Sequence, residues 1–153
     1  SGRTEYVREL MRFIAVDSYG RSLRNRTFAE DRGRETKLAT IARYKFTLAF
    51  ENSIDHDYVT EKFFDPLIAG SVPVYLGAPN ISDFAPGERC YIDVADFAGP
   101  RELADELLRL AAAEHAYQEL LVWKTQPFRE RFQQLVDLNR THVLCRLCAA
   151  LHS

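Results

Sequence analysis

The sequence predicts an α/β fold with a parallel sheet, and three observations point to it. Residues 72–76 form a continuous apolar run, which is typical of a parallel strand that helices cover on both faces. Residues 45–50 indicate a second buried strand, and residues 60–69 between the two have helical spacing. Amphipathic segments follow towards the C-terminus. This order of elements indicates a Rossmann-like unit with a helical C-terminal tail.

The first part of the chain supplies elements around the first strand. Apolar residues at steps of three and four predict a helix over residues 5–14, and residues 16–19 are short and extended. Gly20 turns the chain, and the arginine-rich residues 21–33 lack periodicity and indicate a loop. Residues 37–43 are expected to form a brief helix before the strand at 45–50.

The second part continues the alternation and then becomes helical. Thr60 is expected to cap the helix at 60–69, Pro66 to bend it and Gly70 to end it. Residues 77–80 and 96–100 indicate turns, and residues 90–94 a third short strand. Helices are expected over residues 100–112, 114–124, 127–138 and 141–151.

Length and composition fit one globular domain. The chain has 153 residues, enough to bury a sizeable core, and its 46% hydrophobic and 27% charged residues are ordinary for such a domain. A net charge of −2 gives no reason to expect broad binding to nucleic acid. No apolar run approaches the roughly 20 residues of a membrane span, and no signal peptide is visible.

A polar cluster follows the first strand. Glu51, Asn52 and Ser53 end that strand, and a short loop leads to a helix that opens with Glu61 and Lys62. Open α/β sheets bind ligands at the carboxyl ends of their strands, and the N-terminus of a helix favours anions. The sequence therefore predicts a site for an anionic, phosphorylated ligand.

Three blocks of sequence carry a resemblance to a known family. FTLAFENS, DYVTEK and AGSVPVYLGAPN occur in this order, and together they resemble the signature of the α1,3/α1,4-fucosyltransferases that use GDP-fucose. The likeness runs from about Asp17 to Cys148 and is closest to the branch that fucosylates the core of N-glycans. It implies the donor-binding domain of a two-domain (GT-B) glycosyltransferase, whose N-terminal acceptor domain and general base are absent from this chain.

The resemblance implies inverting transfer of L-fucose from GDP-fucose to the 3-hydroxyl of an N-acetylglucosamine-containing glycan. The expected partners are GDP-fucose, the glycan acceptor and the missing N-terminal domain, with no nucleic acid. The isolated chain is expected to transfer weakly or not at all. Cytoplasmic location is expected of a bacterial protein, and the Golgi lumen, with the membrane anchor removed, of a eukaryotic one.

Two other functions fit the residues. One is a catalytically inactive module that binds a nucleotide or docks a partner. The other is a glycoside hydrolase that uses Glu51 and Glu61 as a carboxylate pair across a sugar.

Two residues at the helix start are the candidate catalytic groups. Lys62 can place an ammonium beside the phosphates, and Glu61 can face the sugar hydroxyls or the positive charge that develops on the ring. Without the flanking motif, a first-turn lysine in a surface ion pair and a glutamate favoured by the helix dipole would be ordinary features.

The remaining candidates are donor-binding residues. The family has a basic residue after its DSYG-like strand that reaches the diphosphate; Arg24-Asn25 is the best match and Arg21 the next, although such a run is usually a solvated surface. Glu51 and Asn52 can contact the ribose or guanine, or Glu51 can instead anchor the loop. Tyr58 can lie against the nucleotide or simply pack in the loop, and Thr60 is first a capping residue.

No cofactor is expected to be required. Asp55-His56-Asp57 mimics the DxD motif of metal-dependent glycosyltransferases, so a divalent metal ion is conceivable, but the resemblance implies basic side chains in place of a metal. Cys145 and Cys148 form the only closely spaced cysteine pair. Without further cysteine or histidine ligands they indicate a structural pair, as a disulfide or as thiols according to compartment.

Overall fold

A three-stranded parallel sheet forms the centre of the computed structural model, which describes residues 2–138. The strands β1 (Phe46–Phe50), β2 (Val72–Leu76) and β3 (Ile92–Asp93) lie in the order β1-β2-β3. Phe46 is opposite Val72 in the register. The predicted helix at 141–151 and the pair Cys145 and Cys148 lie outside the described residues.

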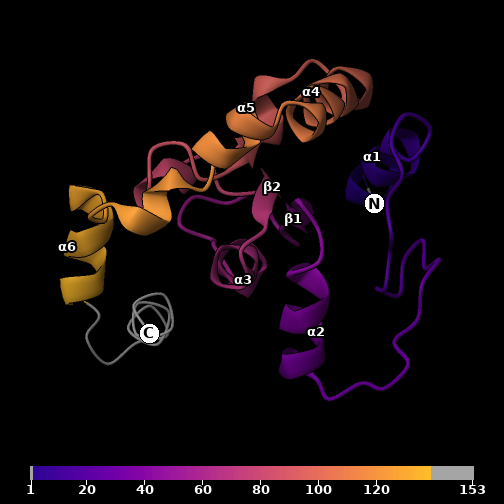
Figure 1. Cartoon of the computed structure of the whole chain (residues 1–153), viewed down its shortest axis with the longest axis horizontal. Helices are drawn as coiled ribbons and strands as arrows, with labels where there is room; N and C mark the ends of the chain where they lie inside the picture. The colour runs from indigo at the N-terminus through magenta and orange to yellow at the C-terminus, as the bar shows by residue number, and fades with distance from the viewer. Residues whose placement is uncertain (1, 139–153) are drawn as a thin grey trace.

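Helices cover both faces of the sheet (Figure 1). On one face, α1 (Gly2–Leu10) and α4 (Pro100–Ala112) pack on alternate residues of β1 and β2, with Leu10, Phe50, Val74 and Leu103 at the centre of that core. On the other, α3 (Glu61–Ala69) buries Phe63 and Leu67 against Ala49 and Tyr75. Helix α2 (Arg34–Ile41) lies beside α3. This two-faced arrangement matches the predicted α/β fold.

The last part of the described chain is helical, as predicted. It contains α5 (Glu114–Glu119), a 3₁₀ turn η3 (Val122–Thr125) and α6 (Glu130–Leu138). Trp123 and Phe132 are buried there and extend the core around α3. Within residues 2–138, no helix is both long enough and apolar enough to span a membrane.

Several boundaries differ from the predicted ones. Helix α1 begins at Gly2 and ends at Leu10, and the third strand has only two residues. Asp93 shortens that strand because its side chain accepts a hydrogen bond from Ala95 N and so caps a 3₁₀ turn, η2 (Val94–Asp96). The helix expected at 114–124 is broken into α5 and η3, and a further 3₁₀ turn, η1 (Ile81–Phe84), follows β2.

Helix α3 begins and ends where its local sequence dictates. The Thr60 hydroxyl accepts a hydrogen bond from Lys62 N at 3.3 Å, and Gly70 ends the helix in the left-handed conformation, with φ of 91°. The buried carboxylate of Asp65 lies 3.0 Å from the Arg34 guanidinium and 2.9 Å from the Lys37 ammonium. Because a buried carboxylate needs such partners, these contacts fasten α3 to α2.

Candidate functional site

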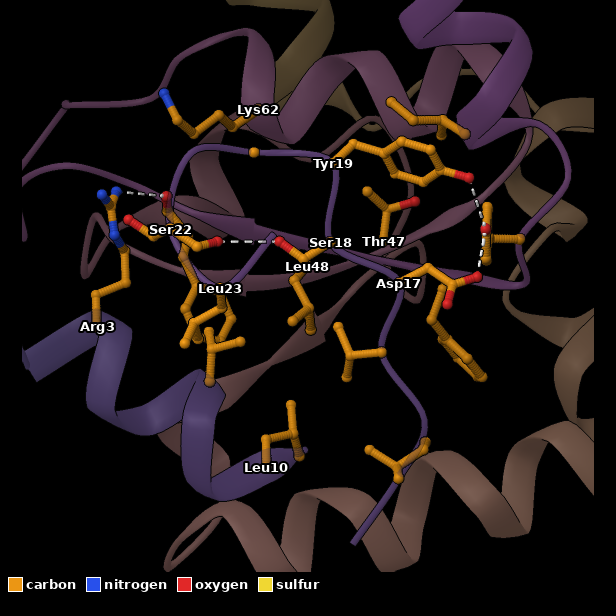
Figure 2. A pocket seen from close by; sticks show the side chains of 18 of the residues that line it. Arg3, Leu10, Asp17, Ser18, Tyr19, Ser22, Leu23, Thr47, Leu48 and Lys62 are labelled. Carbon is orange, nitrogen blue, oxygen red and sulfur yellow. Dashed lines mark hydrogen bonds between the residues drawn. The ribbon is translucent and has the colours of Figure 1, made fainter. Parts of the chain in front are cut away.

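A cavity of about 840 Å³ lies along the edge of β1 that faces away from β2. Figure 2 shows Arg3 and Lys62 towards one end of it and Asp17 towards the other. We call the end lined by Arg3, residues 20–23, Asn52 and Lys62 the polar mouth, and the part lined by Val7, Leu10, Ile14, Leu48 and Leu107 the apolar trough. The polar mouth lies where β1 ends, which is where the sequence places the anion site.

The polar mouth brings together three of the predicted donor-binding residues. Arg21, Asn52 and Lys62 all line the cavity. Lys62 stands in the first turn of α3, and its ammonium lies 3.7 Å from the carboxylate of Glu61, whose side chain is 57% exposed. This separation and exposure make a weak ion pair, so the ammonium can turn to an anionic ligand.

Glu51 lies beneath the loop at 51–60 and does not face the cavity. Its side chain is buried, and its carboxylate accepts hydrogen bonds from Thr60 N at 3.0 Å and from Thr60 Oγ1 at 2.8 Å. A buried carboxylate held in this way anchors the loop to the sheet. Of the two roles that the sequence left open for Glu51, the geometry supports the loop anchor.

Tyr75 braces the same loop from the neighbouring strand. Its hydroxyl accepts a hydrogen bond from Ala78 N at 3.0 Å and donates one to the carbonyl of Tyr58 at 3.4 Å. Burial raises the pKa of Tyr75 to about 12, so the hydroxyl remains a donor at neutral pH. A Cβ at Gly77 would come within 2.5 Å of both Glu51 Cγ and the Tyr75 hydroxyl, so only glycine fits between the two braces. Tyr58 itself is 37% exposed.

Asn80 holds the outer part of the loop. Its amide nitrogen donates to Asp57 Oδ1 at 2.7 Å, and its amide oxygen accepts from Asp57 N at 2.9 Å. The hydrogen bond from Asn80 lowers the pKa of Asp57, and nearby His56 adds to this effect. The pair also holds Asp57 at φ of 65°, a left-handed conformation that is uncommon for residues other than glycine.

The two carboxylates of the DxD-like motif have separate partners. Asp57 bonds to Asn80, whereas Asp55 accepts a hydrogen bond from Ser53. Within residues 2–138, no group of three or more histidine, cysteine, aspartate or glutamate side chains is arranged to hold a metal ion. Metal independence stays a prediction.

The arginine-rich loop is tied mainly to its own neighbourhood. Asn25 accepts a hydrogen bond from Ser18 N at 2.7 Å and donates to the carbonyl of Val16 at 2.8 Å, so both ends of its amide hold the extended segment at 16–19. Arg24 Nε lies 3.3 Å from the carbonyl of Gly20, and its side chain is exposed. Arg24 and Asn25 therefore lie next to the polar mouth but do not line it. The role of Asn25 in the structure is to hold the segment at 16–19.

Comparison with known proteins assigns the chain to a family. The model of the C-terminal part of glycosyltransferase family 10 (fucosyltransferase) matches residues 1–153. The chain belongs to this family.

Among the relatives of this family 10 chain, a putative fucosyltransferase-like protein of Arabidopsis thaliana is 44% identical over 138 residues, which cover 90% of this chain and 26% of that protein. The GDP-fucose protein O-fucosyltransferase 3 of Homo sapiens is 39% identical over 168 residues, which cover 97% of this chain and 35% of that protein. The chain thus spans about a quarter to a third of the length of these curated relatives.

Solved structures confirm the predicted fold class. An α1,3-fucosyltransferase crystal structure matches with a TM-score of 0.72 at 23% identity, covering 99% of this chain and 42% of that one. An α1,3-fucosyltransferase with GDP-fucose matches with a TM-score of 0.68 at 25% identity, covering 91% and 42% respectively. The family model and the curated relatives confirm the predicted fucosyltransferase family, whereas they do not show the predicted α1,3 linkage or the N-glycan core branch.

Sequence analysis of this family 10 chain missed Arg3. Its guanidinium donates to the carbonyl of Phe50 at 3.1 Å and to Asn52 Oδ1 at 2.6 Å, so it joins α1 to the end of β1. An arginine 49 positions before its partner Asn52 gives no local signal of this contact. Arg3 adds a third positive charge to the polar mouth beside Lys62 and Arg21.

A second missed group lies at the opposite end of the cavity. Tyr44 donates a hydrogen bond of 2.6 Å to Asp17, and its hydroxyl lies 3.3 Å from that of Tyr19. The hydrogen bonds to Asp17 and Tyr19 raise the pKa of Tyr44. Arg26 lies 3.2 Å from the same aspartate. This network fixes the segment at 16–19 to the chain that enters β1.

Proposed function

We propose that this chain is the donor-binding part of a fucosyltransferase that uses GDP-fucose. The observation that carries the proposal is the Lys62 ammonium in the first turn of α3, beside the polar end of β1 and within a cavity that Arg3 also lines. Such a helix N-terminus with two nearby cations suits a diphosphate. The likeness to a structure with GDP-fucose and to proteins named for GDP-fucose supports the same donor.

In fucosyl transfer, the donor-binding part must stabilise a leaving diphosphate. The bond between fucose C1 and the β-phosphate oxygen breaks, its electron pair stays on GDP, and the acceptor hydroxyl forms the new bond with inversion at C1. Lys62, with Arg21 and Arg24 from the neighbouring loop, would neutralise the departing charge. Glu61 would face the positive charge on the sugar. The proton of the acceptor goes to a base outside this chain, and no metal ion is needed.

The acceptor has two candidates. The sequence resemblance favours the 3-hydroxyl of N-acetylglucosamine in a glycan, including the N-glycan core, and the likeness to an α1,3-fucosyltransferase with GDP-fucose supports an α1,3 linkage. The protein O-fucosyltransferases, at 39% identity for the human protein, favour a hydroxyl of a protein. Both acceptors use the same donor site. The complete polypeptide, assayed with an N-glycan acceptor and with a protein substrate free of N-glycans, separates them by which product carries fucose.

Calorimetry on the 153-residue chain tests the donor site. We expect GDP and GDP-fucose to bind and ADP to bind clearly more weakly. Failure of both guanine nucleotides to bind, or equal binding of ADP and GDP, would contradict the proposal. Donor binding in the chain without fucose transfer by the complete polypeptide would instead support the inactive nucleotide-binding module. Release of fucose from an aryl fucoside would point to a glycoside hydrolase.

A further inference from the structure

The loop at 51–60 carries exposed apolar surface beside the polar mouth. Within residues 2–138, five large apolar side chains are exposed, and two of them, Ile54 and Tyr58, belong to this loop. Tyr58 is a candidate for contact with the nucleotide, whereas Ile54, at 63% exposed, does not line the cavity. Single exposed apolar residues are common on protein surfaces, so the exposure of Ile54 has meaning only together with its position.

The segment around Ile54 is held in place without a ligand. The Ser53 hydroxyl donates a hydrogen bond to Asp55, and Asp57 N donates to Asn80 Oδ1 at 2.9 Å. The residues on both sides of Ile54 therefore have fixed partners. A side chain on such a segment gives up little conformational freedom when it binds, so Ile54 can use most of the free energy gained by burying its apolar surface.

The chain itself keeps Ile54 close to the polar mouth. Asn52 lines the mouth, and two residues of extended chain span at most about 7 Å. Transfer with inversion requires the acceptor hydroxyl to reach fucose C1 from the side opposite the departing diphosphate. In the proposed function Lys62 holds the diphosphate in the mouth, so the acceptor reaches the sugar across the outer rim. Ile54 is an exposed, preorganised apolar side chain at this rim.

The chemistry of Ile54 distinguishes between the two acceptors proposed above. An aliphatic side chain offers no hydrogen bond, so sugar hydroxyls packed against it would lose their bonds to water without replacement. An apolar side chain of a polypeptide would instead gain from leaving water. A protein acceptor therefore fits the surface at Ile54 better than a glycan does.

We propose that Ile54 contacts the acceptor during fucosyl transfer, and that this acceptor is a polypeptide with an apolar side chain beside the reacting hydroxyl. Ile54 then helps to determine which serine or threonine hydroxyl receives fucose, and it takes no part in proton transfer or in donor binding. This inference rests on the proposed function, because it requires GDP-fucose in the polar mouth.

Kinetics of the complete polypeptide test the contact with two pools of synthetic peptides. Each peptide has one threonine, whose neighbours are leucine in one pool and the similarly sized asparagine in the other. We expect the unchanged enzyme to prefer the leucine pool. Ile54→Ser should lower kcat/KM for the leucine pool by roughly tenfold, whereas kcat/KM for the asparagine pool and KM for GDP-fucose should stay the same.

Two further variants serve as controls. Ile54→Val keeps most of the apolar surface and should retain most of the preference for the leucine pool. Leu108→Ser removes another exposed apolar side chain, 48% exposed in α4 and not part of the cavity lining, and it should change neither the preference nor KM for GDP-fucose. A loss of preference in Leu108→Ser as large as that in Ile54→Ser would contradict a specific contact.

Other results would overturn the proposal. A higher KM for GDP-fucose in Ile54→Ser would place Ile54 against the donor. A lower Tm with equal losses for both pools would mean that Ile54 packs against another part of the polypeptide. Equal transfer to both pools, or transfer only to a free oligosaccharide that ends in N-acetylglucosamine, would exclude the apolar polypeptide contact but leave fucosyl transfer in place. Absence of transfer to every acceptor would contradict the proposed function itself, and this inference with it.

Discussion

The two loops that flank the polar mouth are held in different ways. The loop at 51–60 rests on the buried carboxylate of Glu51 and the buried hydroxyl of Tyr75, and Asn80 fixes its outer part. The loop at 21–33 has no buried residue, and Arg24 donates an exposed hydrogen bond to the carbonyl of Gly20. Buried hydrogen bonds to charged groups are stronger than exposed ones. One side of the site is therefore built in advance, whereas the exposed side chain of Arg24 on the other side can adjust to a ligand.

This difference predicts different energetic roles. A cation held in place before binding acts at full strength, whereas a mobile side chain gives up part of its gain to the cost of ordering. We therefore expect Lys62 to dominate donor binding and the arginines of the other loop to add less. The following variants test the difference between the two loops, in order of decreasing expected effect.

The largest effect is expected from Lys62→Ala. Hydrogen bonds to charged groups contribute on the order of 1.5–3 kcal/mol, so donor affinity should fall by about ten- to a hundredfold in calorimetry. Stability should barely change, because within residues 2–138 Lys62 forms one ion pair, the weak 3.7 Å contact with Glu61. Lys62→Arg, which keeps the charge, is the control and should recover part of the affinity. Unchanged GDP binding in the alanine variant would show that the diphosphate lies elsewhere.

The next effect is expected from Glu51→Ala, which removes the anchor of the loop. The partly buried N–H and hydroxyl of Thr60 then lose their acceptor, which should lower the free energy of unfolding by on the order of 1–3 kcal/mol. Thermal unfolding should show a Tm lower by several degrees. Glu61→Ala is the matched control, since this exposed glutamate ten positions later should leave Tm unchanged. Equal Tm values for the two variants would contradict the anchoring role.

A smaller effect is expected from Asn80→Ala. The outer loop loses its tie to Asp57, so donor affinity should fall a few-fold with little change in Tm. The hydrogen bond favours ionised Asp57 and keeps its pKa low in the folded chain. The stabilisation from the Asn80–Asp57 hydrogen bond is therefore fully present above the unfolded pKa of Asp57, about 3.9. It is lost as the pH falls through the lower pKa that Asp57 has in the folded chain. NMR titration should show the pKa of Asp57 rising in the variant; an unchanged pKa would mean that Asn80 does not hold the loop.

The sequence predicted the parts of the fold that local signals determine. Val72–Leu76 was expected as a strand because it is continuously apolar, and the cap at Thr60 and the stop at Gly70 follow from the preferences of those residues. Boundaries failed where side chains act locally in ways that periodicity does not show, as with Asp93, whose cap shortens the third strand.

The site was predictable only where its residues lie in one stretch of sequence. The neighbourhood of Glu51, Glu61 and Lys62 follows from a strand that leads into a helix. Arg3 and Asn52 are 49 positions apart, and Asn80 and Asp57 are 23 positions apart. No local sequence pattern predicts contacts between residues so far apart. Burial decided the role of Glu51, and burial depends on the tertiary fold.

The smallest effect is expected from Arg24→Ala. A guanidinium contact to phosphate is of the same kind as that of Lys62, but holding this exposed side chain costs about 0.5–1.5 kcal/mol. Donor affinity should therefore fall only a few-fold, and the loss should shrink at high salt because the charge is exposed to solvent. Arg32→Ala, in the same loop and paired with Glu30, is the control and should have no effect on binding. If Arg24→Ala weakened GDP binding more than Lys62→Ala, the arginine loop would be the preorganised side in the bound state, and the order of the two loops would be reversed.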